Sequence, residues 1–214
     1  MNAHHFIMPD TNVTDDVNNH KRLSIGQQYT KRAFDIFFSF WALIFLAPVF
    51  LSIIILQKAT SKESVFFRQE RIGLKGRPFM IQKFRTMKED AEENGPQLAN
   101  EKELNKYTKL GLFLRRTHLD ELPQLWNVLK GEMSFVGYRP ERRYFIDQIL
   151  KIDNRYIELY DMRPGITSEA AIYNGYTDTM EKMLLRLDMD LAYMKKSSIK
   201  TDLIILFKTI GMFF

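Results

Sequence analysis

The sequence predicts a mostly α-helical protein with a small β-hairpin and one helix that inserts into a membrane. A strongly apolar segment of helical length covers residues 33–56. Two short β-like runs follow it, and glycines and a proline lie between them. The rest of the chain shows mainly the apolar spacing that is typical of helices. Together these observations favour a compact globular part attached to a membrane helix.

Composition limits the kinds of function to consider. The chain has 214 residues, enough for one domain with a real core, and 45% of them are hydrophobic. The formal net charge of +5 favours anionic partners such as phosphate-bearing ligands, nucleic acid or an anionic membrane surface. The absence of cysteine excludes disulfides, thiolate metal sites and cysteine nucleophiles, and it fits a reducing compartment.

The first thirty residues differ in character from the rest. Residues 1–30 are polar, rich in Asn, Asp and His, and contain few aliphatic side chains. We predict that they form a disordered or mobile tail. No apolar stretch follows the basic pair Lys21 and Arg22 closely, so we expect no secretory signal there.

Residues 31–58 are predicted to form a re-entrant membrane helix broken near Pro48. Between residues 33 and 56 the only strongly polar residue is Asp35. A straight helix of this length would extend roughly 36 Å, enough to span a bilayer. Pro48 removes a backbone hydrogen bond within it. Basic residues, which tend to stay in the cytoplasm, flank both ends. They are Lys31, Arg32, Lys58 and Lys62. A helix that turns back at Pro48 keeps both ends on that side.

Two alternatives stand beside the re-entrant helix. A plain transmembrane span has the right length but places one basic end outside the cell. A buried core helix is the other alternative. Aromatic side chains lie on all faces of this segment, so that reading would need a much larger protein around it.

Residues 59–214 are predicted to form the globular domain, which begins with a hairpin. The runs 65–67 and 79–84 are β-like, and Gly73, Gly76 and Pro78 mark the turn between them. Helical spacing dominates afterwards. The expected helices are 101–114, 120–129, 141–159, 177–194 and an apolar C-terminal helix at 201–214, which lies in the core or on the membrane surface. The stretches "KGEMSFVGYRP" and "MRPGITS" are expected to be a loop and an extended turn.

Two adjacent acidic residues, Asp120 and Glu121, are the first candidates for chemistry. Pro123 is tolerated only in the first turn of a helix, so we expect the helix to begin near Asp120. An apolar face should follow. It consists of Leu122, Leu125, Trp126 and Leu129. Neighbouring helical residues point about 100° apart, so the two carboxylates would have different roles. Taken alone, the pair is also an ordinary helix start.

Basic residues in loops favour the catalytic interpretation of this pair. They lie beside glycines and prolines and not along helix faces. They are Lys83, Arg85, Arg115, Arg116, Arg139, Arg142, Arg143 and Arg163. Arginine suits bidentate recognition of phosphate. A carboxylate nucleophile, an oxygen ligand for a hard cation and several arginines together indicate phosphoryl transfer, in which charge stabilisation dominates.

Several spaced motifs resemble the bacterial sugar transferase family, and within it the small monotopic polyprenol-phosphate phosphoglycosyl transferases. These motifs are "KRAFD", "VFFRQERIGLKGRPF", "KFRTM", "LDELPQLWNVLKGEMSFVGYRP" and "RPGIT". The resemblance covers residues 31–214. It implies a re-entrant membrane helix-break-helix and a compact cytoplasmic catalytic domain with interfacial helices. It also implies the bacterial inner membrane as location, with the catalytic domain on the cytoplasmic face.

The resemblance assigns roles to individual residues. It implies that Asp120 is a nucleophile that attacks a UDP-sugar, forms a covalent phosphosugar intermediate and releases UMP. Undecaprenyl phosphate would then accept the sugar phosphate. Glu121 would help to bind Mg²⁺. The expected substrate-binding residues are Lys83, Arg85, Arg115, Arg139 and Arg163. Membrane lipid and downstream glycosyltransferases are further expected partners. Two positions depart from the family pattern: His118 replaces a frequent serine, and Tyr138 replaces the proline of "VGPRP".

Three other functions compete with this interpretation. A non-catalytic, membrane-anchored basic adaptor that binds anionic lipid would not need Asp120 or Glu121. A nucleic-acid-binding protein fits less well, because the positive charges are dispersed among acidic ones and no recognition motif is present. A transferase whose role is scaffolding belongs to the same class as the favoured function.

Overall fold

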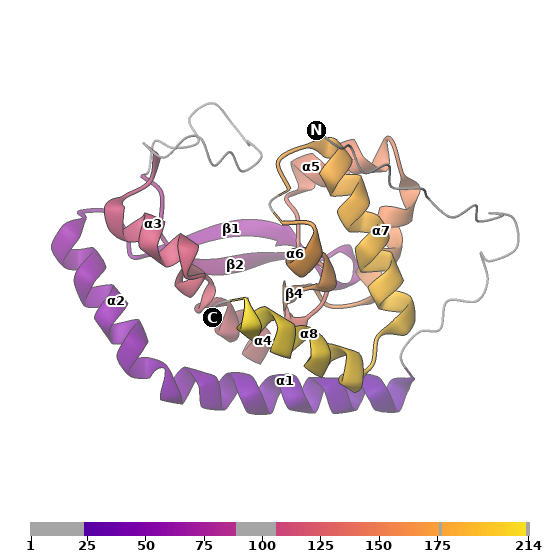
Figure 1. Ribbon diagram of the computed structural model, residues 1–214, viewed down its shortest axis with the longest axis horizontal. Helices are drawn as coiled ribbons and strands as arrows, with labels where there is room; N and C mark the ends of the chain where they lie inside the picture. The colour runs from indigo at the N-terminus through magenta and orange to yellow at the C-terminus, as the bar shows by residue number, and fades with distance from the viewer. Residues whose placement is uncertain (1–23, 89–105, 176, 213–214) are drawn as a thin grey trace, which may run out of the picture.

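The computed structural model describes residues 24–88, 106–175 and 177–212. Within these ranges the chain is mostly helical and has two small two-stranded sheets, β1–β2 and β3–β4. Figure 1 shows that a long helix, α1, runs along one edge of the molecule, and that α4 and α8 lie next to it. The predicted mostly helical fold with a hairpin is confirmed.

Two helices form the apolar N-terminal segment. α1 (Ile25–Phe45) and α2 (Ala47–Thr60) are bent by 57° at a break beside Leu46. Pro48 occupies the first turn of α2, where its missing N–H costs nothing. The predicted break near Pro48 is therefore confirmed. Within the described residues no single helix has both the length and the composition for a bilayer crossing, but the bent pair meets those two criteria together.

The first helix begins earlier than predicted. α1 starts at Ile25, whereas the sequence suggested a boundary at Lys31. A capping box explains the earlier start, because Ser24 accepts a hydrogen bond from the Gln27 N–H and the Gln27 side chain bonds the Ser24 N–H. The predicted tail before residue 24 lies outside the described residues.

The predicted hairpin is confirmed, and its first strand extends further toward the turn than predicted, to Ile72. β1 (Phe66–Ile72) pairs with β2 (Pro78–Phe84) in antiparallel register, with Phe67 opposite Lys83. The short 3₁₀ turn η1 (Leu74–Gly76) joins them. Phe79, Ile81 and Phe84 of β2 are buried, so this strand shows the expected alternation.

The helix expected over 120–129 is divided into two pieces. α3 (Lys109–Arg116) ends before His118, which adopts a left-handed conformation with φ of 52°. A 3₁₀ turn, η4 (Leu119–Glu121), follows, and α4 (Gln124–Lys130) begins only after Pro123. Helical structure therefore begins near Asp120 as predicted, but as a 3₁₀ turn, and the regular α-helix begins four residues later than Asp120, at Gln124. Of the helix predicted over 101–114, residues 101–105 lie outside the described ranges.

The apolar face predicted for α4 is also partly wrong. Trp126 is 47% exposed, while the polar Asn127 is fully buried. The Asn127 amide nitrogen donates to Met80 O at 2.8 Å, and its oxygen accepts from Gln82 N at 3.1 Å. Asn127 thus bonds the free edge of β2, and these hydrogen bonds rotate α4 so that Trp126 points outward.

A second sheet lies where a loop and an extended turn were expected. β3 (Ser134–Val136) and β4 (Gly165–Thr167) pair in parallel. Their backbones approach closely beside Gly137, because a Cβ atom added to Gly165 would lie 2.1 Å from Gly137 N. Only glycine fits at this contact. The sequence "GYRP" therefore leaves β3 directly beside "RPGIT".

The remaining helices enclose the main core. The helix predicted over 141–159 is divided into α5 (Arg143–Leu150) and the 3₁₀ helix η5 (Asn154–Asp161). α7 (Met180–Lys196) and α8 (Ile199–Gly211) confirm the two C-terminal helices, and a short α6 (Glu169–Tyr173) precedes them. The largest buried apolar cluster lies between α5, η5 and α7 and includes Tyr138 and Ile146.

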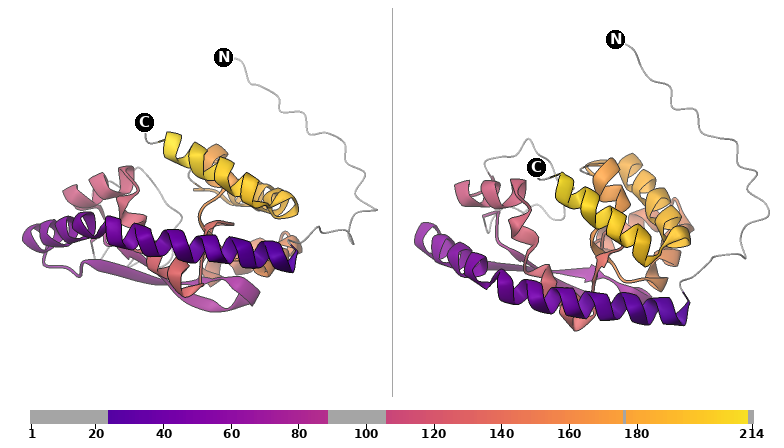
Figure 2. Two further views of the ribbon diagram at one scale, coloured as in Figure 1. Left: turned by 90° about the horizontal axis from the view of Figure 1, so that it is seen from below. Right: turned by 60° about the horizontal axis from the view of Figure 1, so that its bottom comes forward.

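Exposed apolar side chains are most numerous on three of the described helices. They are Phe34, Phe37, Phe38, Phe40, Trp41 and Phe45 of α1, Val49, Leu51, Ile55 and Leu56 of α2, and Leu203, Ile204, Phe207 and Ile210 of α8. Figure 2 shows α1 and α8 on neighbouring parts of the molecule in both views. Such a large exposed apolar surface marks an interaction site.

Candidate active site

Asp120 and Glu121 lie on the short turn η4, between α3 and α4. Asp120 is only 7% exposed. The left-handed His118 turns the chain just before the pair, and the Glu121 N–H donates to His118 O at 3.1 Å. The predicted pair is therefore placed by a tight turn and not by the start of a regular helix.

Two basic residues from distant parts of the chain meet Glu121. Lys83 Nζ, near the end of β2, lies 2.6 Å from Glu121 Oε1. Arg139 Nη2, from the segment after β3, lies 3.7 Å from the same oxygen. The Lys83 and Glu121 side chains are less than one fifth exposed, so this ion pair is largely shielded from water.

The two carboxylates have opposite electrostatic properties. Burial raises the pKa of Glu121, but Lys83 and Arg139 more than offset this effect and lower the pKa to about 2. Burial also raises the pKa of Asp120, and there the cations do not cancel it. Lys83 opposes the rise, while the negative charge of Glu121 adds to it. Glu121 is thus ionised, whereas burial destabilises the ionised form of the neighbouring Asp120.

Arg115 and His118 complete the charged surroundings of Asp120. Both lower the pKa of Asp120 through their charge. The Arg115 guanidinium lies over the Tyr107 ring, 5.1 Å from its centroid. The structure therefore brings together Lys83, Arg115 and Arg139 of the predicted substrate-binding residues around the acidic pair.

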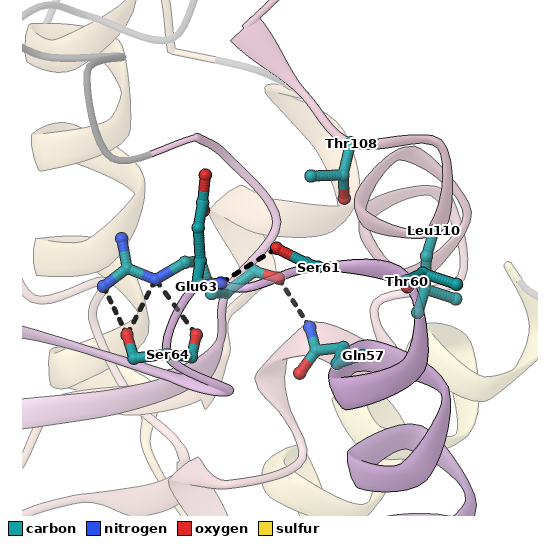
Figure 3. A pocket seen from close by; sticks show the side chains of 8 residues that line it. Gln57, Thr60, Ser61, Glu63, Ser64, Thr108 and Leu110 are labelled. Carbon is teal, nitrogen blue, oxygen red and sulfur yellow. Dashed lines mark hydrogen bonds between the residues drawn. The ribbon is translucent and has the colours of Figure 1, made fainter.

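Arg85 contacts a different part of the molecule. Its Nη2 and Nε donate to the Ser64 hydroxyl at 2.7 and 3.0 Å, and its guanidinium lies 5.8 Å from the Phe67 ring centroid. Figure 3 shows the small pocket between the end of α2 and the hairpin to which it belongs. The cavity has a volume of about 10 Å³, room for about one water molecule. It is too small for a substrate phosphate.

Arg163 lies at the opposite end of α4. Its Nε donates to Gly131 O at 2.9 Å. Arg32 of α1 donates to the neighbouring carbonyls, Val128 O at 2.6 Å and Leu129 O at 2.8 Å. Two arginines therefore satisfy the carbonyl groups at the C-terminal end of α4, where positive charge is favourable. A phosphate-binding role of Arg163 stays a prediction.

Comparison with known families decides the relationship of this chain to other proteins. Residues 26–214 match the family described as "Bacterial sugar transferase". This chain is a bacterial sugar transferase family member. The family assignment made from the motifs is confirmed.

Several curated members of this family are similar to the chain. A UDP-N-acetylgalactosamine-undecaprenyl-phosphate N-acetylgalactosaminephosphotransferase of Aeromonas hydrophila is 37% identical over 85% of this chain and 43% of its own length. A UDP-glucose:undecaprenyl-phosphate glucose-1-phosphate transferase of Klebsiella pneumoniae is 42% identical over 84% of this chain and 39% of its own. The chain thus spans about two fifths of both relatives. The exopolysaccharide production protein PSS of Rhizobium leguminosarum bv. phaseoli is 37% identical, over 84% of this chain and 92% of its own length.

The donor atoms of the acidic pair decide whether it fits a magnesium ion. Within the described residues, no group of three or more His, Cys, Asp or Glu side chains is placed to hold a metal ion. Asp120 and Glu121 offer carboxylate oxygens, the ligands that Mg²⁺ prefers. Mg²⁺ commonly uses one or two carboxylates and takes its other ligands from phosphates and water. The pair fits an ion bound together with a diphosphate.

The "KRAFD" motif has a structural role that the sequence analysis missed. Lys31 Nζ donates to Val136 O at 3.0 Å and pairs with Asp202 of α8. Asp35 accepts hydrogen bonds from Ser134 Oγ at 3.0 Å and Phe135 N at 3.1 Å. These contacts fix α1 to β3. The signal was present, because a lone carboxylate in an apolar helix needs a partner.

Tyr138, one of the two departures from the family pattern, belongs to the main core. Its side chain is fully buried, and its hydroxyl faces Ile72 O at 3.5 Å. Burial raises its pKa far above the usual value. The aromatic ring fills space in the main core, so this position is a packing residue.

Proposed function

We propose that this protein transfers a sugar 1-phosphate from a UDP-sugar to undecaprenyl phosphate and releases UMP. The observation that carries the proposal is the buried Asp120, which lies beside an ionised Glu121 and within a ring of basic side chains. The names of the Aeromonas and Klebsiella relatives describe this type of transfer. Membership of the same family supports extending it to this chain.

The proposed reaction has two displacement steps at the sugar-bearing phosphorus. In the first, an Asp120 carboxylate oxygen bonds to phosphorus, the bond to the bridging oxygen breaks, and UMP leaves with that oxygen. In the second, an oxygen of undecaprenyl phosphate bonds to the same phosphorus and the Asp120 carboxylate is released. The raised pKa of Asp120 supports this role, because its ionised form is poorly solvated and therefore reactive.

The basic residues around the pair are proposed to bind the diphosphate. Arg115 and Arg139 carry guanidinium groups suited to phosphate oxygens, and Arg139 is about half exposed. Lys83 keeps Glu121 ionised. Mg²⁺, when bound, neutralises diphosphate charge and favours departure of UMP, and Glu121 is the residue proposed to hold it. A non-catalytic adaptor would gain nothing from burying this carboxylate pair.

The membrane is the proposed location of the reaction. The bent pair α1–α2 is proposed to enter the cytoplasmic leaflet and return, which would place the globular domain on the cytoplasmic face of the inner membrane. The exposed apolar side chains of α1, α2 and α8 support this placement. The lipid-linked product would then serve downstream glycosyltransferases, as the first membrane step of capsule, O-antigen or exopolysaccharide synthesis.

The proposal can be tested with the purified full chain in detergent, undecaprenyl phosphate, Mg²⁺ and a panel of UDP-sugars. At least one sugar should yield UMP, and Asp120→Asn should abolish its release. Without lipid acceptor, intact mass should show a phosphosugar adduct that hydroxylamine removes. Asp147→Asn is the matched control, because that carboxylate is exposed on α5 and pairs only with Arg143 among the ion pairs of the described residues. Full turnover by Asp120→Asn would contradict the proposed role of Asp120 as the nucleophile.

A further inference from the structure

Asp190 is a buried acid that the proposed reaction does not use. It lies on α7, is 2% exposed, and accepts a hydrogen bond from the backbone N–H of Arg139. Its Oδ1 has no hydrogen-bond partner in the described part of the chain. Burial raises its pKa to about 7, although Arg186 opposes the rise. Burying a carboxylate costs free energy, so a buried acid outside the reaction points to another role, and its contact with Arg139 indicates where that role lies.

The segment around Arg139 is held from several sides. Tyr138 O accepts from Gly165 N at 2.8 Å, and Glu141 O accepts from Ile72 N at 3.1 Å. Between these two anchors, the Asp190 carboxylate receives the Arg139 N–H. The backbone of residues 138–141 is therefore tied to β4, to β1 and to α7.

A buried ion cluster fixes the end of this segment. Glu141 binds Arg186 of α7 at 2.6 Å and Arg71 of β1 at 3.0 Å. Arg71 Nη1 also donates to Pro140 O at 3.2 Å. The Glu141 and Arg186 side chains are less than one tenth exposed, so this ion pair is largely shielded from water. Glu141 faces two arginines, so these three residues carry one excess positive charge, and the charge of Arg186 also acts on Asp190. The hydrogen bond of Asp190 is with the Arg139 backbone.

The side chain carried by this segment reaches the acidic pair. Arg139 is 46% exposed along its side chain, and its Nη2 lies 3.7 Å from Glu121 Oε1. Little packing fixes such an exposed side chain, so its position at Glu121 depends on where its backbone is held. Misplacing a binding group by about 1 Å can cost about 100-fold in rate.

We infer that Asp190 is a positioning residue, which holds the Arg139 backbone so that the Arg139 guanidinium reaches Glu121 and the substrate diphosphate. The inference deepens the proposed function and rests on it for the part that concerns activity. The role requires a hydrogen-bond acceptor at position 190 and does not require a negative charge. Asparagine should therefore replace aspartate, whereas alanine should not.

Kinetics of UMP release by the full chain test this inference. Asp190→Ala should lower kcat about 10- to 100-fold, and Asp190→Asn should stay within about threefold of the wild type. In an Arg139→Ala background, Asp190→Ala should have no further effect, because the group it positions is already absent. Asp188→Ala, an exposed change on the same helix, is the matched control and should leave turnover unchanged.

Hydrogen exchange gives a readout that does not depend on activity. In Asp190→Ala the Arg139 amide should exchange much faster than in the wild type, while the amides of α5 keep their protection. Asp190→Asn should retain the protection. This result is expected even if no UDP-sugar yields UMP, so a failure of the proposed function can be distinguished from a failure of the positioning role.

Three outcomes would overturn the inference. If Asp190→Ala changes neither the hydrogen exchange of the Arg139 amide nor the rate of UMP release, the contact does not hold the Arg139 backbone. Equal losses in the wild-type and Arg139→Ala backgrounds would show that Asp190 acts elsewhere. An asparagine variant as impaired as the alanine variant would show that the charge matters. If Asp190→Ala is too unstable to purify, Asp190→Leu, whose side chain also lacks an acceptor, replaces it, and the same comparison with Arg139→Ala decides.

Discussion

Lys83 Nζ lies 2.6 Å from Glu121 Oε1, and this contact joins the end of the hairpin to the turn that carries the acidic pair. The two residues are 38 positions apart in the sequence. Their pairing explains why Glu121 is ionised in a buried place, and it makes the hairpin part of the candidate active site. Four consequences concern this site and the α4 helix beside it.

Removal of Lys83 should damage both stability and activity. Lys83→Met leaves the Glu121 carboxylate buried without its nearest cation, so the free energy of unfolding should fall by about 3 kcal/mol. UMP release should fall by about 100-fold, because the charge around the diphosphate is disturbed. Thermal unfolding and the UMP assay measure the two effects.

Lys75→Met is the matched control for this change. Lys75 lies 2.9 Å from Asp161, but its side chain is 61% exposed. An exposed pair contributes about 0–1 kcal/mol, so stability and turnover should stay close to the wild type. Equal losses in the two variants would contradict a special role of the Lys83–Glu121 pair.

Replacement of Asp120 should stabilise the protein while abolishing its activity. The folded pKa of Asp120 is raised, so its contribution to stability is complete below the unfolded pKa and is lost as pH rises through the folded value. At neutral pH the ionised group therefore costs free energy. Asp120→Asn should raise the free energy of unfolding at neutral pH by about 1 kcal/mol. Urea unfolding near pH 4 and pH 7 measures this difference, which should be larger at the higher pH. A destabilised variant at neutral pH would count against the raised pKa.

Glu121 should show the opposite pH dependence. Its folded pKa is about 2, below the ordinary value of 4.5. The stability it contributes is therefore present above pH 4.5 and is lost as pH falls from there towards 2. The wild type should lose stability over this window, and Glu121→Gln should lose less. The difference between the two unfolding curves, measured from about pH 6 to pH 3, isolates this carboxylate. Parallel curves would show that Glu121 is not the ionised partner of Lys83.

Arg163 should act on stability more than on substrate binding. Its Nε bonds Gly131 O at the end of α4, so Arg163→Leu should lower the free energy of unfolding by about 1–2 kcal/mol. The KM for the UDP-sugar should change by less than about threefold. The family resemblance implies a phosphate-binding role instead. A KM raised about tenfold with unchanged stability would support that role.

Local patterns in the sequence predicted the elements that depend on neighbouring residues. The hairpin followed from alternation and from Gly73 and Gly76, and the break followed from Pro48. The pair β3–β4 was missed, because three-residue strands carry little periodicity and their pairing depends on the contact between Gly137 and Gly165. The outward Trp126 was missed for a similar reason, since hydrogen bonds from Asn127 to β2 decide how α4 is turned.

The sequence predicted the residues that form the candidate site, but not the residues that hold them in place. Asp120, Glu121 and three basic residues, Lys83, Arg115 and Arg139, stand in motifs and lie together in the structure, whereas Arg85 and Arg163 lie elsewhere. Asp35 and Ser134 are 99 positions apart, and Arg71 and Glu141 are 70 apart. No local pattern links such partners. Residues that hold a site in place are for this reason harder to predict than those that form it.

The contacts of Lys31 and Asp35 lead to a prediction about membrane topology. They bind the N-terminal half of α1 to β3 and α8, so in the proposed membrane arrangement the start of α1 lies on the same side of the bilayer as the globular domain. The chain has no cysteine, so single cysteines can be introduced at Gln28 and Lys62. In intact cells a membrane-impermeant maleimide should label neither position, and in inverted membrane vesicles it should label both. Pro48→Ala alone should not change this pattern, because the contacts of α1, each of about 1 kcal/mol, still hold it. Pro48→Ala combined with Lys31→Ala and Asp35→Ala should expose Gln28→Cys to the outside in part of the molecules. Labelling of Gln28→Cys from outside in the otherwise unchanged protein would establish a straight span and rule out the re-entrant arrangement.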